Sequence, residues 1–122
     1  MPEGRRRAAA AALALSGLLG APAHAADAPD AGAKGKEIYE IRCAPCHGAE
    51  GRGDGPAAAA ITPPPRNFRD PAFWRGRTAG QLRLVVQQGR PGTLMAPFAG
   101  VLSDAEIDAV VAYLVASFGT TR

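Results

Sequence analysis

The chain has 122 residues, of which 47% are hydrophobic and 20% charged, and its formal net charge is +3. This length allows one domain at most. Most of the net positive charge comes from the arginines of residues 5–7, because residues 26–122 hold 11 basic and 10 acidic side chains and have a net charge of only +1. The high pI therefore does not indicate binding to nucleic acid or to a membrane surface.

Residues 1–25 have the order of a secretory signal peptide. The arginines of residues 5–7 precede an apolar, alanine-rich run over residues 8–19, and Ala23, His24 and Ala25 match a cleavage site. A retained membrane anchor is the alternative, but a spanning helix needs about 20 apolar residues and this run is shorter. We expect cleavage after Ala25, export of the chain, and no membrane anchor on the mature protein.

The next segments predict a flexible leader, a helix and a long loop. Residues 26–33 contain Pro29 and show no hydrophobic period. From Lys34 the pattern becomes helical, with Ile38 and Ile41 three residues apart, and the helix runs into Cys43. Residues 48–72 are too rich in glycine and proline for regular structure, apart from one helical turn that residues 57–61 could form.

A second helix is predicted over residues 79–88. Thr78 and Gln81 form a capping box at its start, and Gly89 ends it. A second loop, residues 90–101, follows it and contains Pro91 and Met95.

The last predicted helix begins after Ser103, which forms a capping box with Glu106, and it stops at Gly119. No alternating pattern of useful length predicts a strand. The sequence therefore predicts an all-α domain over residues 34–119, with three main helices joined by two long loops.

The segment Cys43-Ala44-Pro45-Cys46-His47 carries the chemistry of the chain. Two thiols two residues apart can add to the two vinyl groups of a porphyrin, and the following histidine can bind its iron through Nε2. This C-x-x-C-H spacing is the attachment signal for a c-type haem. A thioredoxin-like pair needs a preceding buried strand, a disulfide leaves His47 unexplained, and a closed zinc site needs about four protein ligands.

The second iron ligand can be assigned by elimination. His24 and Met1 leave with the signal peptide, so His47 is the remaining histidine and Met95 the remaining methionine. Met95 lies in a loop, whereas a methionine that fills a core normally lies on a helix face. Ligation by histidine and methionine raises the reduction potential relative to two histidines.

The order of these features resembles class I c-type cytochromes over residues 34–118. Gly35 and Tyr39 are similar to the pair with which that family's first helix crosses its last, and Tyr113 and Leu114 are similar to their partners. The resemblance implies the class I cytochrome c fold, with long loops wrapped around one covalently bound haem.

The resemblance also implies neighbours for the haem. In the family a proline carbonyl accepts a hydrogen bond from Nδ1 of the proximal histidine; Pro56, Pro63, Pro64 and Pro65 are candidates, with Pro65 favoured. Trp74 either reaches a haem propionate or packs in the core. A propionate could also be neutralised by one of the basic cluster, which consists of Arg66, Arg69, Arg75 and Arg77.

The sequence predicts a periplasmic single-electron carrier with one haem c bound through Cys43, Cys46, His47 and Met95, the last two being the metal ligands. A haem c subunit of a respiratory or dehydrogenase complex is the alternative. We expect no catalytic residue and no enzymatic activity, because a ligand-binding or peroxidatic haem protein needs an open iron position. The expected partners are redox proteins, docked at an edge formed by Ala44, Pro45, Ala96, Pro97 and Phe98.

Overall fold

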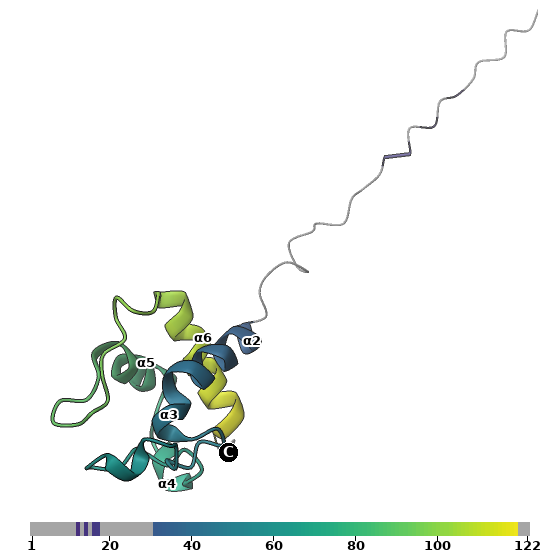
Figure 1. The fold of residues 1–122 in the computed structure, drawn as a ribbon. Helices are drawn as coiled ribbons and strands as arrows, with labels where there is room; N and C mark the ends of the chain where they lie inside the picture. Colours follow the sequence, from purple (N-terminus) through teal and green to yellow (C-terminus); the bar gives the residue numbers. More distant parts are fainter. Residues whose placement is uncertain (1–11, 13, 15, 18–30, 120–122) are drawn as a thin grey trace, which may run out of the picture.

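A computed structural model describes residues 12, 14, 16, 17 and 31–119 of the chain (Figure 1). The predicted cleavage site and residues 26–30 of the predicted leader lie outside the described residues. Within the described residues, no helix has both the length and the apolar character needed to cross a membrane.

The first helix consists of three contiguous parts, α2 (Ala31–Ile38), η1 (Tyr39–Cys43) and α3 (Ala44–His47). It begins at Ala31, three residues before the start that hydrophobic periodicity predicted. In η1 the turns widen, and the Ala44 N–H bonds the Tyr39 carbonyl five residues earlier. Helix α3 continues from this segment with Pro45 in its first turn, and it ends at His47.

The long loop after His47 contains two short helices. The turn predicted within residues 57–61 is confirmed as η2 (Ala58–Ala60). The helix α4 (Pro71–Trp74) was not predicted, although its signals are present in the sequence. The Asp70 carboxylate accepts a bond from the Ala72 N–H at 2.9 Å, and Pro71 occupies the first helical position.

Both predicted capping boxes are confirmed. Thr78 and Gln81 exchange bonds at the start of α5 (Ala79–Gln88), which ends at Gly89 with φ +70°. Ser103 and Glu106 do the same at the start of α6 (Asp104–Phe118). Helix α6 ends before Gly119 as predicted, but that glycine has φ −62° and so does not use the left-handed region.

Helix α2 crosses α6 at Gly35, as the family resemblance implied (Figure 1). A Cβ on Gly35 would collide with the Ala109 carbonyl and lie 2.8 Å from Cβ of Tyr113. The fully buried Tyr39 packs its ring 5.4 Å from those of Tyr113 and Phe118. The absence of a side chain at Gly35 is therefore what permits this close approach.

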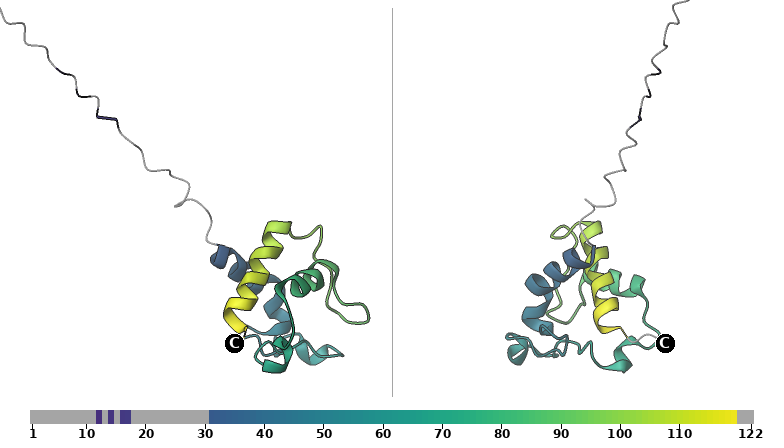
Figure 2. Two further views of the ribbon diagram at one scale, coloured as in Figure 1. Left: turned by 180° about the vertical axis from the view of Figure 1, so that it is seen from behind. Right: turned by 90° about the vertical axis from the view of Figure 1, so that its right-hand side faces the viewer.

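Helix α5 packs on α6, and part of the loop between these two helices extends away from them before the chain returns (Figure 2). Among residues 31–119 the structure shows no strand, only an isolated bridge between Ala99 and Leu102. The all-α prediction is confirmed.

Candidate functional site

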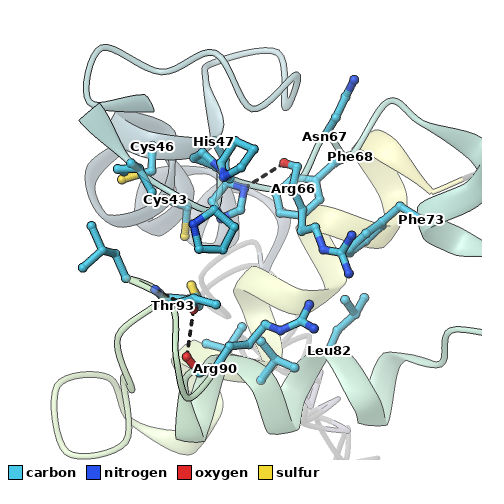
Figure 3. Close-up of a pocket in the computed structure, with 18 of the residues that line it drawn as sticks. Cys43, Cys46, His47, Arg66, Asn67, Phe68, Phe73, Leu82, Arg90 and Thr93 are labelled. Carbon is cyan, nitrogen blue, oxygen red and sulfur yellow. Dashed lines mark hydrogen bonds between the residues drawn. The ribbon is translucent and has the colours of Figure 1, made fainter. Parts of the chain in front are cut away.

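A cavity of about 500 Å³ lies between the first helix, α5 and the two long loops (Figure 3). Its volume is within the range of binding sites for small molecules and cofactors. The helix end contributes Cys43, Cys46 and His47, and the second loop contributes Met95. Most of the remaining lining is apolar, namely Ile61, Pro63, Pro64, Pro65, Phe68, Phe73, Leu82, Val85, Val86, Leu94 and Leu114. The four residues predicted to form the site therefore line one apolar cavity.

The two cysteines lie at the end of the first helix as partly buried free thiols, not as a disulfide (Figure 3). Burial raises the pKa of the Cys43 thiol to about 11, and the neighbouring Cys46 adds to this effect. Within the described residues, no group of three or more His, Cys, Asp or Glu side chains could hold a metal ion. Two free thiols are thus available to bond to a large apolar group bound in the cavity.

His47 is held by contacts from the segment that follows the proline run. Its Nδ1 lies 3.1 Å from the Arg66 carbonyl, which accepts the bond when that nitrogen carries the proton (Figure 3). The Phe68 ring stacks on the imidazole with centroids 4.4 Å apart and planes inclined by 16°. Burial lowers the pKa of His47, although the bond to Arg66 opposes this shift. The neutral tautomer with a free Nε2 is the form that binds a metal.

The prediction that Pro65 accepts the His47 bond was wrong, because the acceptor is the carbonyl of Arg66. Gly53, with φ +75°, explains how the segment comes so close. A Cβ there would lie 2.7 Å from the Pro65 carbonyl oxygen and 3.2 Å from that of Arg66. The accepting group is a backbone carbonyl, which every residue has, so side-chain identity could not decide between Pro65 and its neighbour.

Met95 is presented by a loop that is bonded to itself and to the end of α5. The Arg90 N–H bonds the Met95 carbonyl at 3.1 Å, and the Met95 N–H bonds Oγ1 of Thr93 at 3.2 Å. Gly89 allows the close approach, since a Cβ there would lie 2.5 Å from the Met95 carbonyl oxygen. These contacts hold the Met95 thioether at the cavity surface, although Met95 lies in a loop and not in a helix.

Among the described residues, three arginines and no carboxylate line the cavity. Arg66 and Arg77 belong to the predicted basic cluster, whereas Arg90 was missed because it lies in the second loop. Burial lowers the pKa of Arg77, and the charges of Arg66 and Arg90 lower it further. The positive charge that these three side chains share suits a ligand that carries negative groups.

The other candidates for propionate contacts lie elsewhere. Arg69 bonds the Glu50 carbonyl at 2.7 Å and its carboxylate at 3.3 Å, and neither Arg69 nor Arg75 lines the cavity. The indole N–H of Trp74 donates to the Phe68 carbonyl at 2.8 Å, so its donor is used within the fold. The packing interpretation of Trp74 is therefore the better one.

These features fit a c-type haem, since they combine two free thiols, a histidine whose Nδ1 is held by a carbonyl, a thioether, an apolar wall and three arginines with no described carboxylate beside them in the lining. A comparison with family models agrees, because the Cytochrome c model matches residues 32–117. The chain belongs to the Cytochrome c family. It is an electron-transfer domain that carries covalently bound haem c through the cysteines of its C-x-x-C-H motif.

The similar proteins agree with this family assignment. The chain is 37% identical over 84 residues to cytochrome c-554(547) of Halothiobacillus neapolitanus, covering 67% of this chain and 91% of that protein. It is 45% identical over 104 residues, or 84% of its length, to the dihydro-heme d1 dehydrogenase of Pseudomonas aeruginosa. The match spans only 18% of that dehydrogenase.

A solved structure extends the comparison to the fold. The Kuenenia stuttgartiensis reducing HAO-like protein complex contains a chain that is 30% identical, with a TM-score of 0.60. The similarity covers 68% of this chain and 40% of the other. This member of the Cytochrome c family therefore resembles both a short cytochrome and parts of larger redox proteins.

Proposed function

We propose that this cytochrome c domain carries single electrons between redox proteins in the periplasm, with His47 and Met95 as the axial ligands of its haem iron. The observation that supports the proposal is that Cys43, Cys46, His47 and Met95 line one apolar cavity. When bound, the haem supplies an iron that alternates between the ferric and ferrous states by one electron.

The residues of the chain have distinct tasks in this function. Cys43 and Cys46 would hold the haem, each thiol adding across one vinyl double bond so that sulfur bonds to one carbon and hydrogen to the other. The Arg66 carbonyl holds the proton of His47 on Nδ1, so that Nε2 is free to bind iron. Met95 would supply the opposite ligand. The apolar lining excludes water, which keeps solvent reorganisation small when the charge of the iron changes.

The lining arginines would hold the two carboxylates of the haem. Arg66, Arg77 and Arg90 provide positive charge that no acidic lining residue neutralises. Charge-assisted hydrogen bonds between arginine and carboxylate are among the strongest in proteins. Binding at this side would leave the thiols of Cys43 and Cys46 to hold the other edge of the porphyrin.

The proposal includes export but no catalysis. The signal-peptide pattern of residues 1–25 supports transport to the periplasm, where the two cysteines would receive haem. Two protein ligands leave the iron without an open position for a substrate. Pro45, Ala96 and Pro97 are exposed small residues from the motif and the Met95 loop, which suits brief docking with electron donors and acceptors.

A second candidate is a haem c subunit of a dehydrogenase or respiratory complex. It is supported by the dihydro-heme d1 dehydrogenase, in which the matching region is a small part of a longer protein. Size-exclusion chromatography of the protein from its native host would separate the two. A free carrier elutes as a monomer, whereas a subunit elutes with a partner in fixed stoichiometry.

The axial assignment can be tested by replacing Met95. The oxidised protein should show a weak far-red band from sulfur-to-iron charge transfer, and Met95→Ala should abolish it. The reduced variant should then bind CO, because the sixth position is open. Val101→Ala is the control, since Val101 lies in the same loop, is 55% exposed and does not line the cavity. An unchanged spectrum in Met95→Ala would contradict the assignment.

A further inference from the structure

The orientation of the His47 ring depends on more than its hydrogen bond. The bond from Nδ1 to the Arg66 carbonyl restrains one ring atom, and the imidazole could still tilt about that bond. The Phe68 ring covers one imidazole face at a centroid distance of 4.4 Å and is inclined by only 16°. A parallel ring at this distance blocks tilting toward it, because the two faces are already in van der Waals contact.

Phe68 is itself held firmly, both by its main chain and by its ring. Its N–H donates to the Gly51 carbonyl at 2.6 Å, and its carbonyl accepts the indole N–H of Trp74 at 2.8 Å. The ring is 6% exposed and lies 5.1 Å from Phe73 and 6.0 Å from Phe118. A ring restrained in this way can impose an orientation on its neighbour rather than adapt to it.

Arg69 strengthens the same arrangement from outside. Its guanidinium bonds the Glu50 carbonyl at 2.7 Å and lies 5.0 Å from the centroid of the Phe118 ring. It therefore ties the segment that carries Arg66 and Phe68 to the turn that follows His47. Both contacts to the imidazole come from this one segment, so they are kept in a fixed relation to each other.

We propose that Phe68 is a positioning residue for His47, whose stacked ring sets the plane in which the imidazole presents Nε2 to the cavity. This proposal rests on the assignment of His47 as an iron ligand. The orientation of a ligand plane determines how unpaired electron density is spread over the four quadrants of a porphyrin. The distribution of that density is thus an observable that a purely structural role of Phe68 would leave unchanged.

The test is proton NMR of the oxidised holoprotein, in which the shifts of the haem methyl groups report the spread of unpaired density. Phe68→Leu keeps an apolar side chain but removes the stacked face, and should change the order or the spacing of the methyl resonances. Val111→Ala is the control, because Val111 is 5% exposed in the same core cluster but neither lines the cavity nor belongs to the rings packed around Phe68. It should lower the melting temperature and leave the methyl pattern as it was.

The outcomes separate this proposal from the one on which it rests. Unchanged methyl shifts in Phe68→Leu, or an equal change in Val111→Ala, would overturn the positioning role alone. If the unsubstituted protein shows no hyperfine-shifted His47 resonances, the ligand assignment fails and the positioning role fails with it. Should Phe68→Leu yield no holoprotein, Phe68→Met is used, because methionine fills a similar volume without an aromatic face; the same change in shifts is expected.

Discussion

The two walls of the cavity are built in different ways. The His47 wall depends on contacts between segments far apart in the sequence, since His47 meets Arg66 and Phe68, and Phe68 packs near Phe118. The Met95 wall is local, because its bonds join Arg90, Thr93 and Met95 within a few residues.

This difference separates two kinds of stability. The His47 wall can loosen only if the tertiary fold loosens, so its ligand is held by global stability. The Met95 wall can open while the helices remain folded, since local segments with exposed side chains open at lower free energy than a core. We therefore expect substitutions in the first wall to affect folding and haem retention, and substitutions in the second to affect mainly the ligand at iron.

The largest effect is expected from His47→Ala. This change removes the Nε2 ligand and the bond to the Arg66 carbonyl together, so little or no low-spin holoprotein should form. Haem content can be measured by the pyridine haemochrome assay and by haem staining after denaturing electrophoresis. His24→Ala is the control, because it keeps the small-x-small pattern of the predicted cleavage site. Normal low-spin spectra from His47→Ala would refute the role of this wall.

A pair of glycines compares the two walls directly. Gly53 and Gly92 have φ values of +75° and +77°, so alanine costs about 1–2 kcal/mol of backbone strain at either position. A Cβ on Gly53 would also lie 2.7 Å from the Pro65 carbonyl oxygen, whereas nothing lies within 4 Å of one on Gly92. Gly53→Ala should therefore lower the free energy of unfolding by about 1–3 kcal/mol more than Gly92→Ala. Denaturant titration of both variants measures this, and equal losses would contradict the contrast.

Thr93→Ala tests whether the Met95 wall opens by itself. The hydroxyl donates to the Arg90 carbonyl at 2.8 Å and accepts from the Met95 N–H at 3.2 Å, so its loss should cost about 1 kcal/mol locally. On heating, the sulfur-to-iron band should disappear at a temperature several degrees lower than in the unsubstituted protein. The temperature at which the helices unfold should change little. Val101→Ala, at an exposed residue of the same loop that does not line the cavity, should leave both transitions in place. Simultaneous loss of band and helix in Thr93→Ala would mean that the walls are coupled.

The smallest effect concerns the charge between the walls. Arg77→Gln removes a positive charge from the cavity lining. Because the loss of this charge stabilises the more positive, oxidised iron, the reduction potential should fall by roughly tens of millivolts. Arg75→Gln removes the same charge from an exposed residue that does not line the cavity. Spectroelectrochemical titration should show a larger fall for Arg77→Gln, and equal shifts would contradict a specific role for Arg77.

The sequence predicted what depends on local signals. The capping boxes at Thr78 and Ser103 were found because both partners lie within four residues. The motif at Cys43 was found because covalent attachment requires adjacent groups. The crossing at Gly35 came from the family resemblance, not from any local rule, because its partners lie on the last helix.

The contacts around His47 were not predictable in this way. Phe68 stacks on a ring 21 positions away, and nothing in its own segment indicates that contact. The Arg66 carbonyl acts through its backbone, and Arg90 reaches the cavity only because the second loop folds back on α5. The short helix α4 is a different case. Its Asp70-Pro71 start is a recognisable helix signal, but the many glycines and prolines around it favoured the prediction of a loop.

The crossing of α2 and α6 determines how easily the segment between them can accept insertions. Gly35 and Ala109 are 74 residues apart, so their contact closes one long loop that contains both cavity walls. The entropic cost of loop closure grows with the logarithm of length, by about 0.6 kcal/mol for each doubling. Segment 56–62 is largely exposed, so it has room for an insertion of a few residues. Such an insertion would therefore raise the free energy of loop closure by far less than RT. Related domains should thus differ in length mainly there, while the spacing from Cys43 to His47 stays fixed by the porphyrin.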